Sequence, residues 1–368
     1  MAEEAVKVLV ADDSTIFRNI IKGVLEQIPG VSQVSTAYNG RVAVEKIPSL
    51  MPDLVVVDMD MPEMNGLEVL KFIKATAPHI STVLITSHVS QSATLSLQAL
   101  HEGALDMILK PDSPKADENM EVLAFRLKSL VQVVLDNKRV SALLKAAKEI
   151  SPADRGREPQ RAADSAYEKI SYRRIEAVGI AISTGGPVAL RVFIPRLPGD
   201  LPVPVFIVQH MPATFTAALA ESLDKISALK VVEAASGDAV KPGTVYIAPG
   251  GRHMKVQRDE HSNLPVIVAT DDPMENYCRP SADYLFRSLA GVYGGRVLGV
   301  IMTGMGEDGV KGLKMLKALN APVIAQDEST SVVFGMPREA IRAQIVDTVL
   351  PLELMARAIT RFALSEGE

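Results

Sequence analysis

The sequence predicts an α/β protein of two domains, each built on a parallel sheet with helices on both faces. Its strand-like segments are apolar almost throughout and alternate with segments of helix length, which is typical of strands buried on both faces. The chain has 368 residues, enough for two domains that each bury a core. Between the halves, residues 151–160 are polar, charged and broken by proline, which predicts a linker.

Four strand-like segments in the N-terminal third lead directly into polar side chains. The segments are residues 7–11, 54–57, 82–85 and 106–109. The polar residues that follow them are Asp12, Asp13, Asp58, Thr86 and Lys110. Because the carboxyl ends of parallel strands share one edge of a sheet, we expect these side chains to lie together.

The predicted cluster has the composition of a phosphoryl-transfer site. Carboxylates gathered at one edge repel one another unless a cation neutralises them, and all-oxygen ligands suit Mg²⁺. A phosphoryl group on Asp58 would share its charge with Mg²⁺ and Lys110 and accept a hydrogen bond from Thr86. Each residue alone is also explained as the end of a strand or the cap of a helix, but the set together predicts a functional site.

In the second half, a strand-like run at residues 178–182 ends in Ser183 and a glycine turn that opens a predicted helix. Gly185 lets the backbone approach a bound group closely. Backbone N–H groups at the start of the helix, around Thr184 and Gly185, would stabilise an oxyanion. The pattern is that of a candidate serine nucleophile, but taken alone an ordinary turn without chemistry is the more frequent explanation of these residues.

Two further strand-like segments of this half end in the groups that a serine nucleophile needs. Residues 205–209 end at His210, and residues 296–302 lead into a glycine-rich turn that contains Asp308. At a shared sheet edge, His210 would take the serine proton and Asp308 would orient the imidazole. The chain order Ser, His, Asp, with Ala181 where a G-x-S-x-G elbow has glycine, argues against an ordinary α/β-hydrolase.

Other residues of the second half compete for these roles. His253 follows a hairpin-like stretch at residues 243–247, and we rank it behind His210 as the base. Glu307 is the alternative orienting carboxylate. The backbone N–H of Met305 is a further candidate donor to the oxyanion.

The first 125 residues closely resemble a response-regulator receiver domain. The matching motifs are Asp12-Asp13, Asp58 with residues 61–66, Thr86-Ser87 and Lys110-Pro111. The resemblance implies a flavodoxin-like fold, phosphorylation of Asp58 by a chemotaxis histidine kinase, and Mg²⁺ held by Asp13, Asp58 and the backbone carbonyl of Asp60. It also implies a cis peptide bond before Pro111. Met107 departs from the pattern, because many receivers carry an aromatic switch residue at its position.

The second half resembles the catalytic domain of chemotaxis protein-glutamate methylesterases, the CheB family. The matching stretches are residues 183–187, 209–212, 242–251, 279–283, 303–309 and 333–338. The resemblance implies a Rossmann-like α/β domain with a hairpin. The family's catalytic triad falls on Ser183, His210 and Asp308. Support for the oxyanion falls on Met305, Thr184 and Gly185.

Together the two resemblances imply a receiver at residues 1–125, a helical extension and flexible polar linker at 126–172, and a methylesterase domain at 173–368. The implied enzyme is a serine carboxylic-ester hydrolase, activated by phosphorylation, that acts in chemotactic adaptation. It removes methyl groups from glutamates of methyl-accepting chemotaxis receptors, with release of methanol, and also deamidates certain receptor glutamines. Two alternatives stay open: a phosphorylation-dependent binding module without catalysis, and a hydrolase of esters outside chemotaxis.

Composition restricts the class of protein further. The formal net charge of −5 implies no basic face for nucleic acid or an anionic membrane. The first residues lack the pattern of a signal peptide, and no apolar run spans a bilayer, so we expect a cytoplasmic monomer. Cys278 is the only cysteine, and we rank it far behind Ser183 as a nucleophile. No zinc-ligand spacing such as H-E-x-x-H occurs, and we expect no cofactor for the esterase chemistry.

Overall fold

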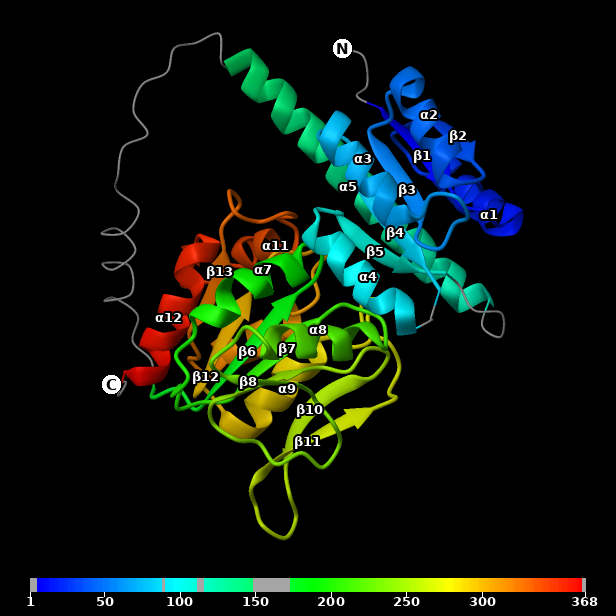
Figure 1. Ribbon diagram of the computed structural model, residues 1–368. Coiled ribbons are helices and arrows are strands. Elements are labelled where there is room, and N and C mark those ends of the chain that lie inside the picture. The colour runs from blue at the N-terminus through cyan, green and yellow to red at the C-terminus, as the bar shows by residue number, and fades with distance from the viewer. Residues whose placement is uncertain (1–4, 88–89, 111–115, 148–172, 366–368) are drawn as a thin grey trace. The chain divides into compact units, whose positions relative to one another are not determined.

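The computed structural model describes residues 5–87, 90–110, 116–147 and 173–365. The chain divides into two compact units, residues 1–156 and 157–368 (Figure 1). The predicted linker core at 151–160 and the predicted cis bond before Pro111 lie outside the described residues. Within the described residues, no helix combines the length and the apolar character needed to cross a membrane.

The first unit is a five-stranded parallel sheet with the order β2-β1-β3-β4-β5, which is the flavodoxin-like order. Its strands are β1 (Val6–Ala11), β2 (Val31–Ala37), β3 (Leu54–Asp58), β4 (Ser81–Thr86) and β5 (Asp106–Leu109). Its helices are α1 (Thr15–Glu26), α2 (Gly40–Leu50), α3 (Gly66–Thr76), α4 (Ser90–His101) and α5 (Ala116–Ala147). The predicted parallel sheet is confirmed, because all four strand-like segments of this third are strands.

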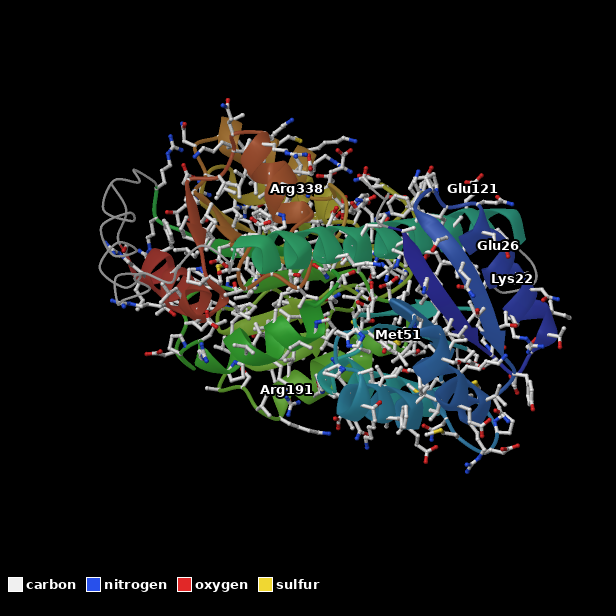
Figure 2. The ribbon with its side chains drawn as sticks, turned by 90° about the horizontal axis from the view of Figure 1, so that it is seen from above. Lys22, Glu26, Met51, Glu121, Arg191 and Arg338 are labelled. Atoms are coloured by element: carbon white, nitrogen blue, oxygen red, sulfur yellow. The ribbon has the colours of Figure 1, made fainter. Side chains whose placement is uncertain are left out.

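Helix starts in the first unit follow from local sequence. Ser14 caps α1, and Asn65 caps α3 in a capping box with Glu68. On the outer face of α1, Lys22 and Glu26 lie one turn apart with 3.7 Å between Nζ and Oε1 (Figure 2). Both side chains are exposed, so this pair contributes only about 0.3–0.5 kcal/mol. The helix is held mainly by the apolar face that it buries.

Helix α5 continues past residue 125, where the sequence predicts the end of the first domain. Arg126 pairs with Asp106 at 3.1 Å, and Lys138 pairs with Asp53 at 2.8 Å. Leucine and valine side chains between these two basic residues are buried. The part of the predicted helical extension up to Lys138 therefore packs on the first unit.

The second unit is a seven-stranded parallel sheet with the order β14-β13-β12-β6-β7-β9-β8. Its strands are β6 (Ala177–Ile182), β7 (Val205–Gln209), β8 (Lys230–Glu233), β9 (Thr244–Ile247), β12 (Val297–Ile301), β13 (Val323–Gln326) and β14 (Thr348–Leu350). Its helical segments are α7 (Gly186–Phe193), η2 (Ile194–Arg196), α8 (Phe215–Asp224), α9 (Ala282–Tyr293), α10 (Val310–Ala318), α11 (Met336–Arg342) and α12 (Leu352–Leu364).

Helices cover both faces of this sheet, as predicted for fully apolar strands. Helix α7 packs against α8 and α12, whereas α9 and α10 pack against each other and against the central strands. The core between sheet and helices includes Phe206, Tyr246, Phe286 and Leu289. Phe206 and Tyr246 stack with ring centroids 5.6 Å apart on the neighbouring strands β7 and β9.

The hairpin of this unit lies in a different place from the one predicted. Residues 244–247 form β9, which pairs in parallel with β7 and β8, so the hairpin-like interpretation of residues 243–247 is wrong. The antiparallel pair is β10 (His253–Arg258) with β11 (Pro265–Thr270), which projects beside the main sheet (Figure 1). The predicted Rossmann-like domain with a hairpin is otherwise confirmed.

Candidate functional sites

Ser183 stands at the carboxyl end of β6, near the middle of the second sheet. Its N–H donates to the carbonyl of Thr303, which follows β12, at 3.0 Å. The next residues turn sharply into α7, where Gly185 is the N-cap with φ of 79°. That backbone angle is costly for residues with a side chain, so glycine is required at the turn. Ser183 itself is 3% exposed.

His210 follows β7, the strand next to β6. Ile182 pairs with Gln209 across the two strands, and the His210 N–H donates to the Ile182 carbonyl at 3.1 Å. The side chain of Gln209 donates to the Ser183 carbonyl at 2.9 Å and so ties the two turns together. Among the described residues, the Ser183 hydroxyl makes no hydrogen bond with the imidazole of His210.

Asp308 lies in the glycine turn before α10 and completes the arrangement. Its Oδ2 lies 2.7 Å from His210 Nε2, and both side chains are buried. The carboxylate also accepts from Ser281 Oγ at 2.7 Å, Asn276 Nδ2 at 3.0 Å, and the backbone N–H groups of Ala282 and Asp283 at 2.6 and 3.3 Å. With these donors the carboxylate is held in one orientation at the start of α9.

The electrostatics of the pair follow from burial and from these contacts. Burial alone would raise the pKa of Asp308, but the hydrogen bond from His210 and the helix-start donors hold that pKa well below its usual range. Burial opposes the charged form of His210, yet neighbouring Cys278 and Asp308 outweigh it and raise the pKa of the imidazole. His210 is therefore a stronger base here than a solvated histidine.

The candidate donors to an oxyanion lie next to Ser183. A Cβ placed on Gly304 would come within 2.8 Å of Ser183 Cβ, so the turn that carries Met305 approaches the serine closely. Among the described residues, the N–H groups of Gly185 and Met305 donate no hydrogen bond within the fold. Thr184 is buried, and its carbonyl accepts from the Thr303 hydroxyl at 2.9 Å.

The competing residues lie elsewhere. His253 is buried; its Nδ1 accepts from the Ser281 N–H at 3.2 Å, and its Nε2 lies 2.9 Å from the Pro273 carbonyl. Both ring nitrogens are thus engaged with backbone. Glu307 is exposed, whereas Asp308 contacts His210.

Sequence reasoning assigned no role to Asn276 and Ser281, although both hold the carboxylate of Asp308. Ser281 falls in one of the stretches that carry the methylesterase resemblance, which is the only signal that pointed to it. The sequence offers Cys278 only as a minor candidate nucleophile. The structure places it beside His210.

The five polar residues of the first unit also meet at one sheet edge. Lys110 Nζ lies 2.7 Å from Asp58 Oδ2 and 3.1 Å from Asp12 Oδ2. Ligand oxygens of Asp12, Asp13 and Asp58 all lie within 4.8 Å of one another. Thr86 is buried at the end of β4, the strand beside β3.

The first-unit cluster fits a hard divalent cation. Burial raises the pKa of Asp58 to about 6, although Lys110 counteracts the effect. Asp58 Oδ1 is buried and has no hydrogen-bond partner among the described residues, which is costly unless a ligand satisfies it. Its oxygens and those of Asp13 are the donors that Mg²⁺ prefers. Asp60 follows on the exposed turn after β3.

Comparisons with known proteins assign each unit to a known domain family. Residues 178–359 match the family model described as CheB methylesterase, and residues 8–119 match the response regulator receiver domain. A protein-glutamate methylesterase/protein-glutamine glutaminase of Desulfotalea psychrophila is 42% identical over 96% of this chain and 97% of its own length. The protein of the same name from Archaeoglobus fulgidus is 40% identical, over 97% of each chain. The crystal structure of the Thermotoga maritima CheB methylesterase catalytic domain is 40% identical, covers 51% of this chain and 98% of that one, and has a TM-score of 0.49.

Proposed function

The chain belongs to the CheB family of protein-glutamate methylesterase/protein-glutamine glutaminases, and from that premise we propose that it hydrolyses glutamyl methyl esters of chemotaxis receptors under control of its receiver domain. The observation that carries the proposal is the buried contact of 2.7 Å between His210 and Asp308, one strand away from Ser183. Both family matches fall within this chain, so one polypeptide carries the receiver domain and the methylesterase domain.

In the proposed reaction, Ser183 Oγ attacks the ester carbonyl and loses its proton to His210. Because Nε2 bonds Asp308, the accepting nitrogen is Nδ1. The N–H groups near Met305 and Gly185 bind the oxyanion, with Thr184 shaping the turn. His210 then protonates methanol as it leaves, and a water molecule hydrolyses the acyl-enzyme by the same steps in reverse. A primary amide follows the same route with ammonia leaving, which supports deamidation of receptor glutamines.

In the receiver, we propose Asp58 as the phosphoacceptor and a chemotaxis histidine kinase as the phosphodonor. Asp13, Asp58 and the carbonyl of Asp60 would hold Mg²⁺, which neutralises charge on the phosphoryl oxygens. Lys110 Nζ contacts both Asp58 and Asp12, and it is therefore close enough to move onto an oxygen of a phosphoryl group on Asp58. Thr86, at the end of β4, would donate a hydrogen bond to it. Phosphorylation then raises esterase activity, for which a coupling of about 1–3 kcal/mol suffices. We propose a cytoplasmic monomer.

The test is methanol release from methylated receptor-bearing membranes, with wild type compared to Ser183→Ala. We expect release by wild type and essentially none by Ser183→Ala. Ser222→Ala is the matched control, because among the described residues the Ser222 hydroxyl donates only to the Leu219 carbonyl within α8. No release from any receptor preparation by folded wild type would contradict the proposal and favour another ester or a binding role.

A further inference from the structure

A third ligand-type side chain lies beside the candidate catalytic pair. The ligand atoms of His210, Cys278 and Asp308 all lie within 4.8 Å of one another. His210 and Asp308 are 8% and 2% exposed, and Cys278 is half-buried. The esterase mechanism needs the imidazole and the carboxylate but gives the thiol no task. One nitrogen, one sulfur and one oxygen ligand atom thus lie close together, and the esterase mechanism does not explain why the sulfur is among them.

This set of ligands suits a borderline-soft divalent cation. Zn²⁺ is bound by histidine nitrogen, cysteine thiolate and carboxylate oxygen, and three protein ligands leave a fourth position for water. Metal–ligand bonds of about 2.0–2.3 Å place neighbouring ligands of a tetrahedral ion about 3.3–3.7 Å apart. The observed spread therefore requires side-chain shifts of only about an ångström. A thiolate and a carboxylate also balance the two positive charges, so the buried site carries no net charge.

We propose that His210, Cys278 and Asp308 form a zinc-type site whose occupation switches the esterase off. Hydrogen bonds from Ser281 and Asn276 already orient the carboxylate of Asp308, as metal-binding carboxylates require. On binding, the thiol proton passes to solvent, and the neutral imidazole keeps its one proton, which moves from Nε2 to Nδ1.

Inhibition follows from the geometry of the catalytic pair. Nε2 of His210 and Oδ2 of Asp308 lie 2.7 Å apart, which is closer than two ligands of one tetrahedral ion. An ion bound by Nε2 and Oδ2 would therefore separate them and break the hydrogen bond that orients the imidazole. A metal-bound, displaced imidazole no longer accepts the proton of Ser183.

The two candidate cation clusters found among the described residues differ in ligand class. The cluster of Asp12, Asp13 and Asp58 offers only oxygen ligands and favours Mg²⁺. The proposed site contains sulfur and nitrogen, which favour zinc and cobalt. An excess of Mg²⁺ will consequently mask the receiver cluster and leave the proposed site free for a spectroscopic probe.

Cobalt binding tests the site without any assay of activity. Co²⁺ is titrated into the full chain in excess Mg²⁺, and the absorption band of thiolate-to-cobalt charge transfer is recorded. Cys278 is the only cysteine, so the band reports this site alone. We expect a saturating band in wild type that Zn²⁺ removes, a much weaker one in His210→Gln, and an unchanged one in the exposed-histidine control His261→Ala. Absence of the band in wild type, or an undiminished band in His210→Gln, overturns the proposal.

Zinc inhibition of methanol release is the second arm, and it rests on the proposed function. We expect Zn²⁺ to inhibit wild type reversibly, with activity restored by a chelator. In Cys278→Ser about tenfold more Zn²⁺ or higher should be needed, each protein being compared with its own metal-free rate. Equal zinc sensitivity of the two proteins would overturn the inhibitory role. No methanol release by the metal-free wild type would instead contradict the proposed function, and the cobalt band would still decide the metal site.

Discussion

We propose Ser281 as a positioning residue for the esterase, because its hydroxyl donates to Asp308 at 2.7 Å and the carboxylate lies 2.7 Å from His210 Nε2. We expect Ser281→Ala to lower kcat about tenfold or more with little change in KM, since a hydrogen bond to a charged group contributes about 1.5–3 kcal/mol. Steady-state kinetics of methanol release would measure the split between kcat and KM.

The control for Ser281→Ala must separate loss of a helix cap from loss of the contact with Asp308. Ser281 caps α9, as Ser14 caps α1 in the other unit, and each cap contributes about 1 kcal/mol to stability. Ser14→Ala should therefore cost similar stability and leave basal esterase activity intact. A comparable fall in kcat in both variants would argue against a positioning role for Ser281.

Cys278 lies beside His210, and we expect it to influence the pH dependence of the esterase through the pKa of the imidazole, without a step of its own in the reaction. The imidazole must be neutral to act as base, so activity falls as pH drops through its pKa. Burial opposes that pKa, but Cys278 and Asp308 raise it, which moves the acidic limb of kcat/KM above the range of an ordinary histidine. In Cys278→Ser, measured with a chelator present, we expect the limb to move to lower pH. A limb that stays in place would show that the thiol does not contribute.

At the scale of single residues, sequence reasoning found the groups that strands carry to the sheet edge. Ser183 and His210 each end a strand, and Asp308 lies in the glycine turn that follows one, so local pattern and parallel topology predict that they meet. The sequence indicated no role for Asn276, and for Cys278 only that of a nucleophile ranked far behind Ser183. Both reach His210 or Asp308 from the segment before α9, whose path depends on tertiary contacts and not on any periodicity.

Between elements, the packing of α10 on α9 depends on a glycine. A Cβ on Gly312 would lie 2.6 Å from Phe286 Cβ and 3.0 Å from the Asp283 carbonyl oxygen, neither of which moves easily. Gly312→Ala should therefore destabilise the second unit by about 1–3 kcal/mol in urea unfolding followed by circular dichroism. Gly291, exposed on α9, is the matched control, because nothing lies within 4 Å of its Cβ position. Gly291→Ala should stabilise by up to about 1 kcal/mol. Shifts of the same sign would contradict this view of the helix pair.

The location of the hairpin shows what element-level prediction lacks. Residues 244–247 follow a Pro-Gly turn, and a turn beside a short apolar run is equally typical of a hairpin and of a strand in a parallel sheet. Pairing with β7 and β8 comes from distant parts of the chain and decides the outcome. Strands that are apolar throughout were predicted correctly, because their burial on both faces is visible in the sequence alone.

For the whole molecule, the proposal places two chemistries in two compact units of one chain. In this proposal, phosphorylation requires Asp58, a buried carboxylate that contacts Lys110 in the first unit, and ester hydrolysis requires Ser183 in the second. The two single substitutions should therefore separate the activities. We expect Asp58→Asn to keep basal methanol release and to lose its increase with a small-molecule phosphodonor and Mg²⁺.

The reciprocal variant completes the argument. Ser183→Ala should take up the phosphoryl group as fast as wild type, as followed by the mobility shift of the phosphorylated chain in a phosphate-binding gel, while releasing no methanol. Lys110→Ala adds a graded case, because Asp58 loses the ammonium that lies 2.7 Å from its Oδ2, and with it the cation that joins Mg²⁺ in sharing phosphoryl charge. Its phosphodonor response should fall while basal release persists. If Asp58→Asn still responded to phosphodonor, control would have to act through a site other than this carboxylate, and the coupling between the two units would need another origin.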